Sequence, residues 1–170
     1  MAIKGWSEAR QLPRLGMVRL GIKKKNANGV EFPTATDYFV CPPEVQEKYG
    51  DKPRSLDIRL PLEGTVDEIF PQFYKLYGRS AGLKAVSDGE RITWLDRDAE
   101  GKIIERIERV DDVKKLEEAG FRPTGTLSFL VPKVSMAGVY QLVTGSFHTI
   151  RNINSGLDLI RGIFGRVDYP

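Results

Sequence analysis

The residues of this 170-residue sequence that could catalyse a reaction form no recognisable catalytic constellation. His148 is the only histidine and Cys41 the only cysteine, which excludes a zinc site built from cysteines. Ser146 lies close to His148, but Thr144-Gly-Ser146 lacks the flanking glycines of a nucleophile turn. Ser87-Asp-Gly-Glu90 lies between two apolar runs, where an Asp-Gly pair is typical of a hairpin turn. The sequence therefore predicts no enzyme, no metal site and no cofactor.

Basic side chains offer the remaining chemistry, which is contact with phosphate groups or with an acidic partner. The net charge is only +3, but residues 1–30 hold seven basic residues and one acidic residue. Neither a phosphate-binding loop nor a dinucleotide fingerprint occurs. The candidate residues for binding nucleic acid or a partner are Arg14, Arg19, Lys23, Lys24, Lys25, His148, Arg151, Asn152, Ser155 and Arg161. If all of them share one face, they form a basic surface that could contact phosphates. The alternative is that these charged side chains only face the solvent and keep the protein soluble.

The C-terminal candidates depend on a strand that leads into a helix. Val139–Thr144 alternates as a strand, and a Gly-Ser turn follows it. Apolar residues then recur every three or four positions, at Phe147, Ile150, Ile153, Leu157, Ile160 and Phe164. This spacing predicts an amphipathic helix over 147–164 whose apolar stripe faces the core. The candidates from His148 to Arg161, with Asp158, fall on the opposite face.

The N-terminal candidates belong to a predicted hairpin. Residues 15–22 and 36–41 are typical of strands, and the Asn- and Gly-containing loop at 23–29 joins them. Gly16 and Gly21 predict a bulge or a close approach of backbone. The hairpin would carry the three consecutive lysines at its tip.

The remaining pattern predicts further strands and two further helices. Residues 55–60, 83–86, 91–95, 103–109 and 127–131 are typical of strands. Thr65 is a suitable N-cap for a helix over about 66–77, with Pro71 near its start, and an Asp cap precedes a short helix over about 112–119. The expected fold is α+β, with mostly antiparallel sheet, two main helices (about 66–77 and 147–164) and one short helix. A single domain over 1–170 fits this length.

Several stretches of the sequence together resemble one known family. They are Leu12–Ile22, Thr36–Val40, Phe70–Tyr74 and above all Gly138–Gly165, which contains Val139-Tyr-Gln, Ser146-Phe-His and Ile153-Asn-Ser-Gly-Leu-Asp-Leu-Ile160. On these residues the chain resembles the phage recombination directionality factor-like family, from about Leu12 to Pro170. Relatives are often labelled as a hydrolase or a metal-binding protein. They also continue past the position of Pro170, which predicts a truncated or short member.

The resemblance implies a role in DNA recombination without catalysis. Characterised members bind a large serine integrase on DNA and switch it from integration to excision, so it implies a serine integrase and DNA as partners. The alternative from the basic residues is a stand-alone protein that binds single-stranded or structured DNA. The third hypothesis is a hydrolase, although the sequence supplies no nucleophile–base pair.

The sequence departs from the family at one segment. Relatives commonly carry cysteines in the stretch that matches residues 83–90 and again before the strand that matches residues 127–131, an arrangement suited to zinc. This chain has no cysteine there. We expect the 83–121 subregion to replace the metal with a capped helix packed on the hairpin of residues 91–109.

The location of the protein follows from what the sequence lacks. No apolar run approaches the ~20 residues that cross a bilayer. The first residues also lack the apolar core of a signal peptide. We therefore expect a cytoplasmic protein that does not enter a membrane.

Overall fold

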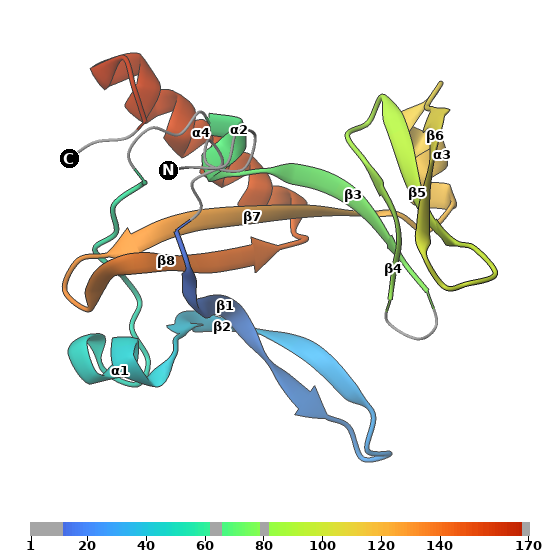
Figure 1. The fold of residues 1–170 in the computed structure, drawn as a ribbon. Helices are drawn as coiled ribbons and strands as arrows, with labels where there is room; N and C mark the ends of the chain where they lie inside the picture. Colours follow the sequence, from blue (N-terminus) through green and yellow to red (C-terminus); the bar gives the residue numbers. More distant parts are fainter. Residues whose placement is uncertain (1–11, 62–65, 79–81, 168–170) are drawn as a thin grey trace. The chain divides into compact units, whose positions relative to one another are not determined.

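The computed structural model describes residues 12–61, 66–78 and 82–167 (Figure 1). Its helices are α1 (Pro43–Tyr49), α2 (Val66–Ile69), α3 (Val113–Glu118) and α4 (Phe147–Phe164). Its strands are β1 (Arg14–Lys25), β2 (Glu31–Val40), β3 (Gln72–Tyr77), β4 (Leu83–Ser87), β5 (Arg91–Arg97), β6 (Ile103–Arg109), β7 (Arg122–Val131) and β8 (Ser135–Thr144). No described helix is long and apolar enough to span a bilayer.

The strands follow the hydrogen-bonded order β2-β1-β8-β7-β3-β4-β5-β6. Pairing is mostly antiparallel, and the exception is β1, which runs parallel to β8. The predicted α+β class is therefore confirmed. The chain divides into two compact units: the first contains the described residues of 1–64, 127–143 and 166–170, and the second those of 65–126 and 144–165.

The first unit is organised around the β1–β2 hairpin and the adjoining β8. The antiparallel register of β1 and β2 confirms the predicted hairpin, and it shifts between Arg19 and Gly21. A second shift, between Arg14 and Gly16, marks the pairing of β1 with β8. A Cβ atom at Gly21 would lie 2.4 Å from the Thr34 carbonyl oxygen, so the close approach of backbone predicted at this glycine is confirmed.

The core of the first unit lies between β1, β8 and α1. Val18 and Val45 are fully buried, and Tyr140 is nearly so. The Tyr140 hydroxyl lies 3.4 Å from Glu44 Oε1 of α1. Burial and this carboxylate both raise the pKa of Tyr140, so the phenol stays neutral and donates the hydrogen bond.

The segment at residues 55–60 corrects one prediction. Among the described residues it makes a single bridge, in which Arg59 and Leu130 exchange backbone hydrogen bonds of 3.0 and 2.7 Å, rather than a strand. Ile58 is exposed, although the alternation predicts a buried face. Alternation shows where side chains of an extended segment point, but a strand also needs a partner strand along its length.

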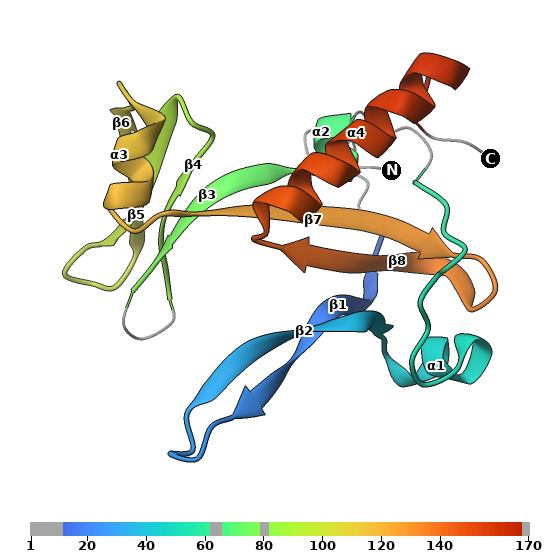
Figure 2. The ribbon, with the colours of Figure 1, turned by 180° about the vertical axis from the view of Figure 1, so that it is seen from behind.

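The second unit is an antiparallel sheet. In this sheet the N-terminal part of β7 pairs with β3, β3 pairs with β4, β4 with β5, and β5 with β6. The helix α3 packs on this sheet (Figure 2). Leu116 and Phe121 form a buried cluster with Ala85 and Ile92, and the Phe121 ring meets Trp94 edge-on at 6.0 Å. The side chain of Asp112 accepts a hydrogen bond from Lys114 N, which confirms the predicted cap.

The predicted helix over 66–77 is wrong. The helix α2 ends at Ile69, and residues 72–77 form β3 instead. Pro71 explains the change, because it has no N–H for a helical bond and its ring clashes with the preceding turn. Its carbonyl accepts from Thr126 N at 3.0 Å, which starts the pairing of β3 with β7. The predicted cap, Thr65, lies outside the described residues.

Candidate partner-binding surfaces

The three consecutive lysines lie at the turn end of the β1–β2 hairpin, where all three are exposed. The turn that follows is held by Asn26, whose Oδ1 accepts from Asn28 N and Val30 N at 3.0 and 2.9 Å. Lys24 lies opposite Phe32, whereas Lys25 lies opposite Glu31. The Nζ of Lys23 is 3.6 Å from Glu31, so one acidic side chain offsets part of the charge at this end.

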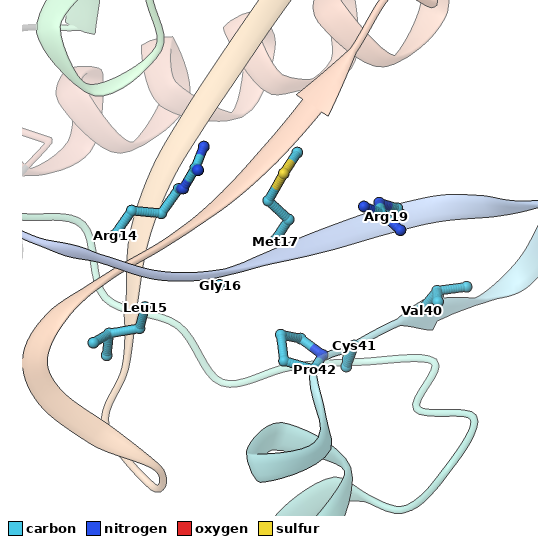
Figure 3. Close-up of a pocket in the computed structure, with 8 residues that line it drawn as sticks. All are labelled: Arg14, Leu15, Gly16, Met17, Arg19, Val40, Cys41 and Pro42. Atoms are coloured by element: carbon cyan, nitrogen blue, oxygen red, sulfur yellow. The ribbon is translucent and has the colours of Figure 1, made fainter.

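Arg14 and Arg19 lie nearer the base of the hairpin. They line a hollow of about 440 Å³ together with Met17 and Pro42, and Figure 3 shows Arg14 and Met17 on one side of β1. Cys41 also lines the hollow, and burial raises the pKa of its thiol, which disfavours a reactive thiolate. The structure therefore brings two of the predicted basic residues together at one hollow.

The predicted polar face of α4 divides into two strips. Arg151 and Ser155, together with Asp158, line a groove of about 470 Å³ between α4 and the sheet of the second unit. The Ser155 hydroxyl donates to the Arg151 carbonyl at 2.9 Å, so it is engaged within the helix. Arg161 is paired with Asp158 at 3.2 Å. His148 and Asn152 are exposed outside this groove.

The groove is fixed by contacts between α4 and β3. Gln72 and Asn154 exchange hydrogen bonds of 2.7 and 3.2 Å through their side-chain amides. The close packing needs Gly125 on β7, because a Cβ there would lie 2.5 Å from the Phe70 ring and 3.4 Å from Ile150. A mixed polar and apolar groove of this kind can bind a peptide segment or a small polar ligand.

The ends of α4 differ from the prediction that its apolar stripe is core. Leu157 is 4% exposed, but Phe147 is 67% exposed and lines the groove. Phe164, in the last turn, is also more than half exposed. The helical period gives the direction of each side chain, but burial also needs a neighbouring element at that height along the axis.

Two exposed apolar residues on the outer side of α4 were not identified from the sequence. Leu159 and Ile163 are 63% and 65% exposed and lie one turn apart, so they share a side of the helix. Gly156, one turn before Leu159, has open space around it. Asn152 and His148 extend the same line toward the N-terminus at spacings of four. We use the name outer strip for the line formed by His148, Asn152, Gly156, Leu159 and Ile163. The spacing of three or four residues between its members is the sequence signal from which it could have been predicted.

Two of the segments considered for catalysis or metal binding have structural roles. Ser146 is the N-cap of α4, and its Oγ accepts from Thr149 N at 3.4 Å. Asp88 Oδ1 accepts from Arg91 N and Glu90 N at 2.7 and 2.8 Å, and these bonds hold the pKa of its carboxyl below the ordinary value. The Ser87–Glu90 segment is thus the predicted hairpin turn. Within residues 12–61, 66–78 and 82–167, no group of three or more His, Cys, Asp or Glu residues is placed to hold a metal ion.

The fold and its surfaces define a class of protein: an α+β protein whose basic and apolar side chains are presented on an exposed hairpin and an exposed helix. Comparison with known families is more specific. Residues 15–169 match the Gp3-like family, described as recombination directionality factor-like, and the chain belongs to this family. Neither the curated proteins nor the solved structures contain a match. Family membership supports an accessory role in recombination and a phage context.

Proposed function

We propose that the protein is a non-catalytic recombination factor that docks on a serine integrase bound to DNA. The outer strip of α4 carries this proposal. Leu159 and Ile163 expose most of their apolar surface on an ordered helix, and such a strip is typical of a helix that binds in an apolar groove. Arg166, beyond the helix, adds positive charge close in sequence to these residues. Family membership supplies the recombination context.

A gel-shift experiment with the cognate integrase tests the proposal. The integrase is bound to each of its attachment sites, and the full chain is then added. We expect a slower-migrating complex in the gel and, in a parallel reaction that contains pairs of attachment sites, a changed spectrum of recombination products, because a directionality factor alters which sites recombine. An unchanged product spectrum at saturating protein would refute the proposed function.

A second function, binding to DNA without an integrase, is favoured by the hairpin tip. Lys24 lies across from Phe32, which is partly exposed, so a cation and a stacking surface occupy the same face. Each lysine that contacts a phosphate releases counterions, so the affinity would fall steeply with salt.

Alanine at Lys23, Lys24 and Lys25 tests this second function. If all three contact phosphates, the substitutions should lower the slope of log affinity against log salt by about 2 to 3. The matched control is a triple substitution of lysines away from the hairpin, at Lys102, Lys114 and Lys115, which should leave the slope unchanged. Binding that does not depend on salt would exclude this function.

A further inference from the structure

The strand β6 has an exposed outer edge. It is the last strand of the hydrogen-bonded order, and within the described parts of the chain it pairs only with β5. All seven residues of Ile103–Arg109 are exposed, including Ile107 at 66%. A regular edge strand of this length, with apolar side chains, is a template for pairing with another strand.

The hydrogen bonds of the β5–β6 hairpin determine which residues face that edge. Val110 N donates to Glu90 O at 2.8 Å, and Asp98 N donates to Lys102 O at 3.0 Å. The even-numbered residues of β6 therefore direct their backbone groups toward β5, because this direction alternates along a strand. The odd-numbered residues, Ile103, Glu105, Ile107 and Arg109, direct theirs outward.

We propose that two copies of the chain associate by antiparallel pairing of β6 with β6, with Ile107 opposite Ile107 of the second copy. In this register Glu105 lies opposite Arg109, and Arg106 lies opposite Glu108. The two-fold axis repeats both pairs on its other side, which gives four pairs of opposite charge around one apolar pair.

The alternative registers place like charges together. Centring the pairing on Arg106 sets two arginines face to face, and centring it on Glu105 or Glu108 sets two glutamates face to face. Like charges directly opposite destabilise an antiparallel pair. Among the registers centred between Glu105 and Glu108, the sequence is self-complementary at Ile107 alone, which is why we favour a second copy over another partner strand.

The side chains that would meet at this edge are available for pairing. Arg106 and Glu108 interact with each other at 3.4 Å and pack near Trp94 on the α3 side of the sheet, but both stay more than half exposed. Glu105 and Arg109 project from the other side, because successive residues of a strand alternate. Ile107 lies between them on that side.

The contact would be small. One strand pair supplies about six backbone hydrogen bonds in this register. A single pair of short strands buries much less surface than the roughly 1,200–2,000 Å² that is typical of stable interfaces. We therefore expect reversible, concentration-dependent dimers rather than a permanent dimer.

Charge reversal at the pair on the open side tests the register. Sedimentation velocity of the full chain over a range of concentrations gives the dimer dissociation constant. Glu105→Arg alone and Arg109→Glu alone should each weaken association at least tenfold, because each sets like charges opposite at two places. The combined Glu105→Arg/Arg109→Glu variant should restore the dissociation constant to within about threefold. Failure of the double variant to recover, or a wild-type chain that stays monomeric at every concentration, would overturn the proposal.

Cross-linking provides an independent test of the geometry. Residues in a hydrogen-bonded pair have Cα atoms about 5.5 Å apart, which falls within the range that a disulfide spans. Ile107→Cys should therefore cross-link rapidly between copies under oxidising conditions. Ile104→Cys is the matched control on the same strand, and it should react much more slowly because its register partner is Val110. Cys41 is buried and can remain. Equal rates for the two variants, or no cross-link with Ile107→Cys, would contradict the proposed register.

Discussion

Replacing the two apolar residues of the outer strip should weaken docking on the integrase–DNA complex. The variant is Leu159→Gln/Ile163→Gln. Glutamine is a good helix former, so α4 should persist while its apolar surface is lost. Neither residue is buried in the free protein, so the substitutions should change the thermal midpoint of unfolding little.

The expected loss follows from the exposed fractions. Burying a whole Leu or Ile side chain stabilises by about 1.5–3 kcal/mol. Leu159 and Ile163 still expose 63% and 65% of their surface, so docking has about 1–2 kcal/mol to gain from each. Together they would contribute about 2–4 kcal/mol, which corresponds to roughly 30-fold to 1,000-fold in the dissociation constant.

The assay titrates wild-type and variant protein onto a preformed complex of the cognate integrase with attachment-site DNA. Ile58→Gln is the matched control, since Ile58 is also an exposed isoleucine but lies outside α4. Circular dichroism confirms that each variant is folded. If the double variant binds within threefold of the wild type while the integrase complex itself forms, the outer strip does not dock and this reasoning fails.

Three further predictions concern the second unit. Gly125→Ala should destabilise the protein by about 1–3 kcal/mol in urea unfolding, because the added Cβ would lie 2.5 Å from the buried Phe70 ring. Leu116→Ala should cost about 2–5 kcal/mol, measured in the same way, since Leu116 is 2% exposed in the cluster beneath α3. Asp88→Ala should destabilise at neutral pH, and the difference from wild type should shrink as pH falls. The hydrogen bond from Arg91 N, and then the one from Glu90 N, lower the pKa of the Asp88 carboxyl in the folded protein below its ordinary value of 3.8. The ionised carboxylate therefore stabilises the folded state fully above the unfolded pKa, and this contribution is lost as pH falls through the folded pKa.

Each of these predictions has a clear contrary result. Equal urea midpoints for Gly125→Ala and Gly156→Ala would contradict the packing argument, because Gly156 has open space around it. Val113→Ala is the control for Leu116→Ala, since Val113 is exposed on the same helix. For Asp88→Ala, a difference from wild type that stays constant from neutral pH to pH 2 would show that the turn bonds do not depend on its charge.

Local chemistry made much of the fold predictable. The β1–β2 hairpin, the Ser87–Glu90 turn and the capped helix α3 each depend on residues close together in the sequence. Alternation, turn residues and N-caps act over such short distances, so the pattern alone indicates them. The helix α4 was predicted with correct bounds for the same reason.

The errors arose where a distant partner decided the outcome. Residues 72–77 carry an apolar spacing that fits a helix, but Pro71 ends α2 and β7 offers a ladder for β3. Residues 55–60 alternate well, yet they make only the bridge at Arg59. In both segments the sequence pattern was compatible with two structures, and long-range pairing selected one of them.

The sequence by itself determined the class of fold, the family resemblance and the basic character of the hairpin, because these depend on residue types and short spacings. Tertiary structure decided which side of α4 is exposed. It placed Leu159 and Ile163 outside the core, turned Phe147 to the groove beside Arg151, and left the β6 edge unpaired within the described chain. Exposure depends on which elements pack nearby, and a helical or strand period fixes only the direction of each side chain.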